Sequence, residues 1–145
     1  MASMPESANR VILGCAARVR VLVVEDFTPY RQFICSTLAS MGSLQIIAEV
    51  SDGVEAVQEA VKLQPDLILL DIGLPSLNGI EAARQIRKLA PESKIIFLTQ
   101  ESSADVVQEA LNLGARGYVV KMKAASELLT TVEAVLLGKT FVGGI

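Results

Sequence analysis

The chain has 145 residues, no histidine and a formal net charge of −3 at pH 7. Without histidine, this chain cannot assemble a Ser-His-Asp or Cys-His catalytic group or a histidine-ligated metal site. Its composition, 51% hydrophobic and 20% charged, is typical of a folded domain and not of a disordered segment. The net negative charge gives no overall basic surface for a nucleic-acid backbone.

The length fits one small domain. Cys15 and Cys35 are too few for a disulfide framework and fit a reducing compartment. After the N-terminal segment, the longest apolar run is Leu67 to Leu70, which is too short to cross a bilayer. We therefore expect a soluble, cytoplasmic protein without membrane contact.

Five short apolar segments predict strands, in chain order at residues 21–24, 46–50, 66–70, 94–98 and 118–120. Each is followed by a segment with apolar side chains at helical spacing. The first four of these helices are predicted to start at side chains that cap helices, namely Thr28, Asp52, Asn78 and Ser102. Pro29 supports the first start, and a glutamate three residues after Asp52 and after Asn78 supports the next two.

Five strand–helix units in succession predict an α/β domain with a doubly wound parallel sheet covered by helices on both faces. The strands are unbroken apolar runs, as expected where both faces of a sheet are buried. We expect residues 19–138 to form this domain. Residues 1–18 are interpreted as a flexible N-terminal leader, and residues 139–145 as a C-terminal tail or the start of a linker.

Reactive side chains directly follow four of the predicted strands, and they are Glu25, Asp26, Asp71, Thr99 and Lys121. The carboxyl ends of parallel strands meet at one edge of the sheet, so we expect these side chains to converge there. Three carboxylates would repel one another, and a hard cation such as Mg²⁺ would remove the conflict. Thr99 and Lys121 could contact the oxygens of a phosphoryl group.

Each of these residues also has an ordinary structural explanation. Asp26 could cap the helix near Thr28, and Thr99 could cap the helix after Ser102. Lys121 could be a solvated strand end, and Asp71 could belong to an ordinary strand–helix turn. Their joint placement at one sheet edge favours a functional site.

Over about residues 19–138, the sequence resembles the receiver domains of two-component response regulators. The segments that carry the resemblance are Val23–Asp26, Asp66–Pro75, Asn78–Gly79, Leu98–Thr99 and Gly114–Lys121. The resemblance implies a flavodoxin-like, five-stranded sheet with strand order 2-1-3-4-5. It also implies a signalling switch that promotes only its own phosphorylation and dephosphorylation, and so is not a conventional enzyme.

The resemblance also implies a role for each site residue. Asp71 would be the phosphoacceptor, and Lys121 would contact the phosphoryl group. Mg²⁺ would be held by Asp26, Asp71 and the backbone carbonyl of Gly73, with Glu25 acting through water. Thr99 and Tyr118 would be the switch pair, with the Tyr118 ring turning inward. The phosphoryl group would come from the histidine of a sensor histidine kinase.

Three residues depart from the usual pattern of the family. Lys121 is commonly followed by proline, whereas Met122 follows it here, so the peptide bond could be trans and Lys121 could be shifted. Gln100 stands where many receivers have a small residue, and its side chain could screen the phosphoryl site. Glu25 replaces the aspartate often found first in the acidic pair, which a contact through water would tolerate.

The segment from Ala125 to Val142 resembles receivers of LuxR-type transcriptional regulators. The expected output is therefore transcriptional control through a DNA-binding domain absent from this chain. Switching, and a homodimer, are expected at the face formed by the helix after Ser102, the strand at 118–120 and the last helix.

Three alternatives remain at this point. The chain could be a stand-alone receiver that works through protein contacts. It could be an interaction module that never becomes phosphorylated. A haloacid-dehalogenase-like phosphohydrolase is a further alternative, but that class resembles an Asp-x-Asp arrangement, and Ile72-Gly73 follows Asp71. A nucleotide-binding protein would need a glycine-rich loop after the first strand, and none is found there.

Overall fold

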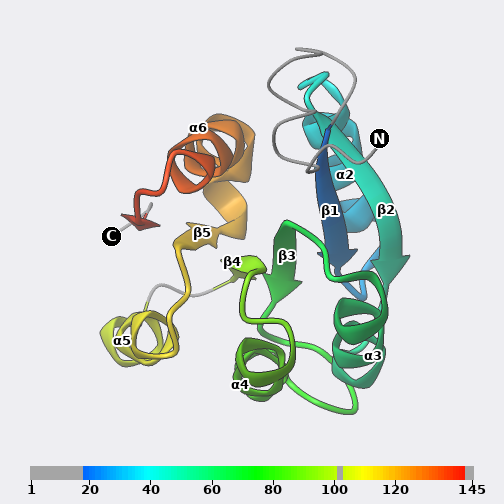
Figure 1. Cartoon of the computed structure of the whole chain (residues 1–145). Coiled ribbons are helices and arrows are strands. Elements are labelled where there is room, and N and C mark those ends of the chain that lie inside the picture. The colour runs from blue at the N-terminus through cyan, green and yellow to red at the C-terminus, as the bar shows by residue number, and fades with distance from the viewer. Residues whose placement is uncertain (1–17, 101–102, 143–145) are drawn as a thin grey trace.

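Strands and helices alternate along the chain as predicted (Figure 1). The computed structural model describes residues 18–100 and 103–142. Its strands are β1 (Val19–Val24), β2 (Leu44–Val50), β3 (Leu67–Asp71), β4 (Lys94–Thr99), β5 (Gly117–Val120) and β6 (Phe141–Val142). Its helices are α2 (Thr28–Ala39), α3 (Gly53–Leu63), α4 (Gly79–Leu89), α5 (Ala104–Asn112), the 3₁₀ turn η1 (Lys121–Lys123) and α6 (Ala124–Leu136). None of the helices within the described ranges is both long enough and apolar enough to cross a membrane.

The strands form one parallel sheet in the order β2-β1-β3-β4-β5-β6. The predicted order 2-1-3-4-5 is confirmed for the first five strands. The sheet has a sixth strand, β6, that was not predicted. β6 pairs with β5 through Gly117 and Tyr118, and the Phe141 amide donates to the Arg116 carbonyl at 2.9 Å. Sequence patterns do not show this strand, because its two residues gain their extended form from pairing with β5.

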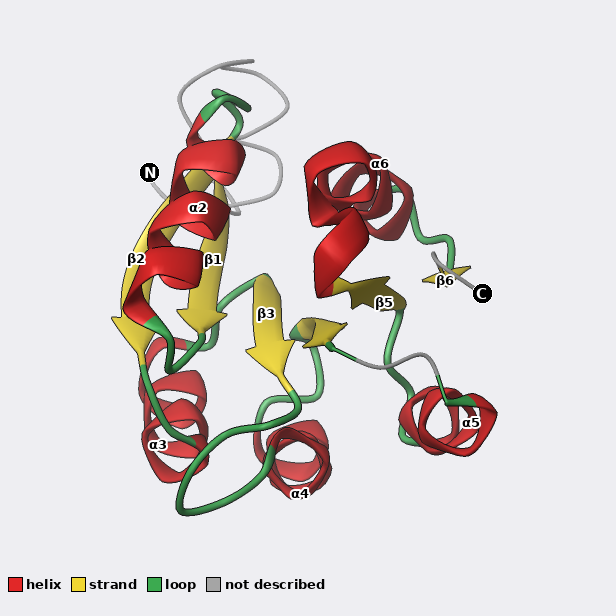
Figure 2. Cartoon of the chain, turned by 180° about the vertical axis from the view of Figure 1, so that it is seen from behind, coloured by secondary structure: helices red, strands yellow, loops and turns green. Residues whose placement is uncertain are grey.

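Alternate side chains of each central strand enter two separate hydrophobic layers. In β1, Leu22 and Val24 belong to the hydrophobic cluster that includes side chains of α3, α4 and α5, whereas Val21 and Val23 belong to the cluster that includes side chains of α2 and α6. Figures 1 and 2 show these two groups of helices on opposite sides of the sheet. All four of these side chains are fully buried, and each contributes about 1.5–3 kcal/mol relative to an exposed side chain.

Two of the predicted helix caps are confirmed. The Asp52 carboxylate accepts the Glu55 amide at 2.8 Å, and the Asn78 side chain accepts the Glu81 amide at 3.0 Å. The predicted cap at Thr28 is wrong by one residue, because Phe27 occupies the cap position and Thr28 begins α2. The Phe27 amide donates to the Glu25 carboxylate at 3.0 Å, which fixes the extended backbone before the helix.

The start of α5 also differs from the prediction. Ser102, the predicted cap, lies outside the described residues, and Ser103 holds the cap position without a side-chain hydrogen bond.

The turn between β3 and α4 brings the helix start against the end of the strand. The Gly79 amide donates to the Ile72 carbonyl at 2.8 Å. A Cβ at Gly79 would overlap the backbone carbonyl of Asp71, so only glycine allows this approach. The packing of α4 therefore fixes the backbone of Asp71.

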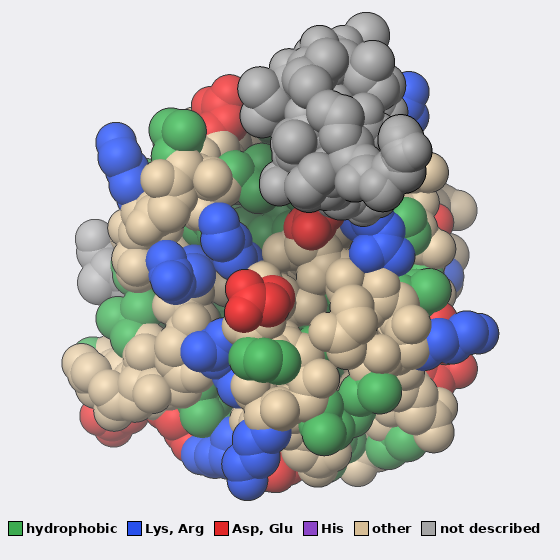
Figure 3. Space-filling model, in the orientation of Figure 1, with side chains coloured by type: hydrophobic (Ala, Val, Ile, Leu, Met, Phe, Trp, Pro, Cys, Tyr) green, Lys and Arg blue, Asp and Glu red, His purple; other side chains and the backbone are tan. Residues whose placement is uncertain are grey.

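The molecular surface carries charges of both signs. On the face seen in Figure 3, acidic, basic and hydrophobic side chains lie beside one another. This mixture agrees with the small net charge of −3.

Candidate functional site

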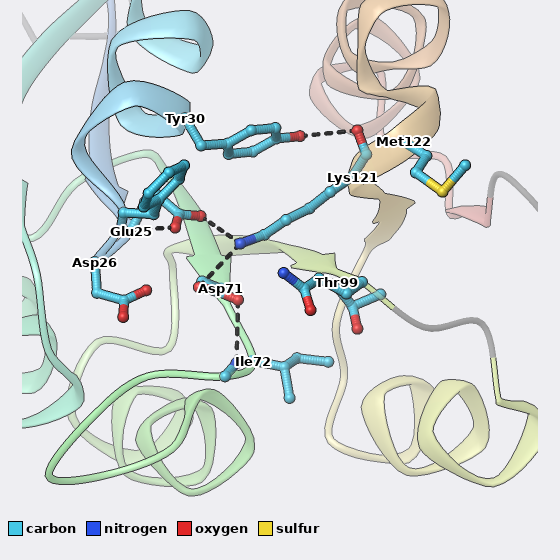
Figure 4. Close-up of a pocket in the computed structure, with 11 residues that line it drawn as sticks. Glu25, Asp26, Tyr30, Asp71, Ile72, Thr99, Lys121 and Met122 are labelled. Atoms are coloured by element: carbon cyan, nitrogen blue, oxygen red, sulfur yellow. Dashed lines mark hydrogen bonds and ion pairs between the residues drawn. The ribbon is translucent and has the colours of Figure 1, made fainter.

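A cleft of about 900 Å³ opens at the carboxyl edge of the sheet (Figure 4). It lies where β1, β3, β4 and β5 end. The predicted site residues that line it are Glu25, Asp26, Asp71, Gly73, Thr99 and Lys121. The structure thus brings together side chains that are as far apart in the chain as residues 25 and 121.

Three carboxylates form an acidic cluster in this cleft. Ligand oxygens of Glu25, Asp26 and Asp71 all lie within 4.8 Å of one another. Glu25 is fully buried and Asp71 is 4% exposed, whereas Asp26 is exposed. Oxygen ligands at this spacing, with an exposed side for water, suit Mg²⁺. The residues present therefore fit a hard divalent cation.

Lys121 supplies the positive charge of the cleft. Its Nζ lies 2.8 Å from Glu25 Oε1 and 3.1 Å from Asp71 Oδ2. Burial alone would lower the pKa of Lys121, but the hydrogen bond to Glu25 and the charge of Asp71 outweigh it, so this pKa is raised. Burial raises the pKa of Glu25, and its bonds to Lys121 and the Phe27 amide offset only part of this. The ammonium and the two acids thus form one coupled charge cluster.

The change from proline to Met122 does not move Lys121 out of the cleft. The peptide bond after Lys121 is trans, and Lys121 begins the 3₁₀ turn η1. The Met122 side chain is 90% exposed. With this trans bond, Lys121 reaches both the Glu25 and the Asp71 carboxylates.

The Asp71 carboxylate is held at the end of β3. Its Oδ1 accepts the Gly73 amide at 3.0 Å, and its Oδ2 faces Lys121 (Figure 4). The strand is anchored beyond this point, because the Ile72 amide donates to the Leu98 carbonyl of β4 at 3.0 Å. Asp71 therefore presents a fixed, nearly buried carboxylate at the base of the cleft.

Thr99 and Tyr118 occupy different places. Thr99 ends β4 at the cleft wall and is 5% exposed. The Tyr118 ring does not line the cleft and is fully buried, in the same cluster as Phe97 of β4 and Val107 of α5. The Tyr118 ring is therefore part of the hydrophobic core and not of the cleft wall.

Tyr30 and Phe27 line the cleft but were not identified from the sequence. In the sequence, Tyr30 belongs to the apolar stripe of the first predicted helix, which indicates a packing role. Its position four residues after Asp26, at the same sheet edge, is the signal that could have found it. The Tyr30 hydroxyl donates to the Lys121 carbonyl at 3.1 Å.

The sequence model of the response regulator receiver domain matches residues 21–133. The chain belongs to this family. The transcriptional regulatory protein LiaR of Bacillus subtilis is 35% identical over 121 residues, which are 83% of this chain and 57% of LiaR. The response regulator VraR of Staphylococcus aureus is 32% identical over 122 residues, which are 84% of this chain and 58% of VraR. The receiver domain thus spans a little over half the length of these relatives.

Solved structures agree with this assignment. A LuxR-family response regulator from Aurantimonas sp. SI85-9A1 has a TM-score of 0.82 at 29% identity, covering 86% of this chain and 89% of that one. The response regulator domain of Thermotoga maritima CheB has a TM-score of 0.74 at 33% identity. The match covers 80% of this chain and 94% of the CheB domain. Receiver domains are signalling modules that bind Mg²⁺ at an acidic site, and this chain carries such a cluster.

Proposed function

We propose that this receiver domain is a phosphorylation switch in which Asp71 accepts a phosphoryl group from a sensor histidine kinase. The observation that carries the proposal is the fixed, nearly buried Asp71 carboxylate between the Gly73 amide and the Lys121 ammonium. A carboxylate oxygen of Asp71 attacks phosphorus, and the bond from phosphorus to the donor histidine nitrogen breaks. The electron pair of that bond stays on the nitrogen, and the phosphoryl group remains on Asp71.

The residues around Asp71 have distinct parts in this proposal. Mg²⁺ would be held by Asp26, Asp71 and the Gly73 carbonyl, with Glu25 acting through water. When bound, the ion supplies positive charge to the phosphoryl oxygens. Lys121 lies beside the attacking carboxylate, where its ammonium can pair with a phosphoryl oxygen.

The response to phosphorylation would begin at Thr99. Its hydroxyl is at the cleft wall and can donate to a phosphoryl oxygen. Thr99 is the last residue of β4, and Tyr118 of β5 belongs to the same hydrophobic cluster as Val107 and Ala110 of α5. Thr99 and Tyr118 together would then bias the α5-β5-α6 face between two arrangements.

The output is proposed from the relatives. LiaR is a transcriptional regulatory protein, and the solved Aurantimonas protein is a LuxR-family regulator. We therefore favour transcriptional control through a DNA-binding domain outside this chain, with a homodimer through the α5-β5-α6 face. A stand-alone receiver that acts through protein contacts is the alternative. The family assignment leaves no support for a haloacid-dehalogenase-like phosphohydrolase.

The dependence on a divalent cation tests the proposed chemistry. We expect the domain to gain the mass of one phosphoryl group when treated with phosphoramidate in Mg²⁺, and to gain none in EDTA. Asp26→Asn removes one anionic ligand, so the rate in Mg²⁺ should fall by at least about 10-fold, the loss that follows removal of a mere partner of a metal ligand. Intact-mass spectrometry over time measures both effects. Uptake at equal rates in Mg²⁺ and EDTA would contradict the proposal.

Gln100 provides a second prediction about the same cleft. Its exposed side chain lines the cleft next to Thr99 and can screen the phosphoryl group from water. We expect Gln100→Ala to speed hydrolysis of the phosphorylated domain by up to about tenfold, a change of about 1.4 kcal/mol in the barrier. The control is Gln108→Ala, which removes an exposed glutamine of α5 whose side-chain amide donates to Asn112, four residues later. Equal hydrolysis rates in wild type and Gln100→Ala would remove this role.

A further inference from the structure

Tyr30 contacts both the backbone and the side chain of Lys121. Its hydroxyl donates to the Lys121 carbonyl oxygen at 3.1 Å. The Lys121 Nζ also lies 5.0 Å from the centroid of the Tyr30 ring, within the range of a cation–π contact. Figure 4 shows the ring extending from α2 across the cleft toward the start of η1. One side chain thus touches both ends of the lysine.

Tyr30 is itself firmly placed. It lies in the first turn of α2, which is anchored in the core by the fully buried Ile34 and Leu38. Its ring packs against Phe33 with the centroids 5.5 Å apart. Burial and the charges of Glu25 and Asp71 raise the pKa of Tyr30 to about 12, so its hydroxyl remains a donor at neutral pH.

Lys121 gains from such support because its side chain is long and flexible. A lysine side chain has a flexible four-carbon stem, and it loses considerable conformational entropy when it is held in one geometry. The following residue, Met122, is 90% exposed and adds almost no packing to fix the backbone at this turn. The hydrogen bond from Tyr30 instead ties this backbone to a helix 91 residues earlier in the chain.

We propose that Tyr30 is a positioning residue that holds the Lys121 ammonium at Asp71 during phosphoryl transfer. It acts through Lys121 and does not contact the phosphoryl group. This inference rests on the proposed function, because it assigns Tyr30 a part in the same reaction.

Two substitutions separate the contributions of the hydroxyl and the ring. Tyr30→Phe removes only the hydrogen bond and should slow phosphoryl uptake by about fivefold. Tyr30→Leu also removes the aromatic face and should slow uptake by about 10- to 30-fold. Met41→Ala is the matched control, because Met41 packs in the same hydrophobic cluster beyond the far end of α2. It should leave the rate within about twofold of wild type, at a comparable loss of thermal stability.

A double-mutant cycle separates positioning from general support of the fold. In a Lys121→Met background, assayed at high phosphoramidate over long times, Tyr30→Leu should cause no further slowing. A second readout needs neither metal nor phosphorylation. In EDTA, acylation of the Lys121 amine by an amine-reactive reagent, followed by peptide mass spectrometry, should be about two- to fivefold faster in Tyr30→Leu than in wild type.

The outcomes are distinct. If wild type takes up no phosphoryl group, the proposed function fails, while the acylation rates still test whether Tyr30 holds Lys121. If wild type is phosphorylated but Tyr30→Leu matches its rate, only the inference about Tyr30 is overturned. Equal slowing by Tyr30→Leu in the wild-type and Lys121→Met backgrounds would also overturn it, because the effect would then not pass through the lysine.

Discussion

We expect the Asp71→Asn variant to take up no phosphoryl group from phosphoramidate in Mg²⁺, at any time at which wild type is modified. The amide has no anionic oxygen to attack phosphorus, whereas the carboxylate of Asp71 does. The fold should persist, because the asparagine oxygen can still accept the Gly73 amide that now bonds to Asp71 Oδ1. The variant loses the ion pair with Lys121, which lowers the stability of the fold. It also loses the charge repulsion with Glu25, which raises it. The free energy of unfolding should therefore change by no more than about 1 kcal/mol.

Asp66→Asn is the matched control for this variant. Asp66 lies directly before β3, at the opposite end of the strand from Asp71, and accepts the Arg20 amide at 2.8 Å. The same chemical change at this position should leave phosphoryl uptake unchanged. Uptake by a folded Asp71→Asn protein, confirmed by circular dichroism, would show that another residue is the acceptor.

The second large effect is expected for Lys121→Met, which removes the ammonium but keeps an unbranched side chain. Phosphoryl uptake should slow by about 10²- to 10³-fold, because one preorganised charge is lost beside the attacking carboxylate. The variant also leaves the fully buried Glu25 without its ion pair. Loss of one partner from a buried pair costs about 3–5 kcal/mol, so the free energy of unfolding near pH 8 should fall by about that amount.

The loss of stability in Lys121→Met should depend on pH in a definite direction. The pKa of Glu25 is raised above its ordinary value of 4.5 in the folded protein, mainly by burial. Its protonation therefore favours the folded state, and stability falls as pH rises from about 4.5 through the folded-state pKa. Without Lys121 this pKa rises further, because the bond that lowers it is gone. The difference from wild type should thus be smaller near pH 5.5 than near pH 8.

Urea unfolding in EDTA at these two pH values measures the effect. Lys123→Met is the control, since Lys123 is exposed and lies in the same 3₁₀ turn. It should change the free energy of unfolding by less than about 0.5 kcal/mol at either pH. An equal loss in Lys121→Met at both pH values would contradict the coupling between Lys121 and Glu25.

The parts of the fold that could be predicted from the sequence are those governed by local pattern and burial. The apolar runs at 21–24 and 67–70 are fully buried central strands, and the caps at Asp52 and Asn78 form as expected. β6 could not be predicted, because a two-residue strand depends on its partner strand. The cap at Thr28 was misplaced because the carboxylate of Glu25, a residue of the site, holds the Phe27 amide instead.

For the site, the sequence predicts which residues reach the sheet edge but not how they contact one another. Their positions in the chain place Asp71 at the last residue of β3 and Lys121 directly after β5, and thus both at the carboxyl edge of the sheet. The pairing of Lys121 with both Glu25 and Asp71 depends on rotamers, and the contact with Tyr30 joins residues 91 positions apart. The spacing from Asp26 can place Tyr30 at this sheet edge, but no local pattern shows which atoms of Lys121 it contacts.

The position of the phosphoryl group tests the central claim most directly. Wild type treated with phosphoramidate in Mg²⁺ is reduced with borohydride, which converts an aspartyl phosphate to homoserine, and is then digested for peptide mass spectrometry. We predict homoserine at position 71 and at no other aspartate, with none formed in EDTA. Homoserine at Asp26, or a phosphorylated protein with intact aspartate at position 71, would contradict the assignment of Asp71 as the phosphoacceptor.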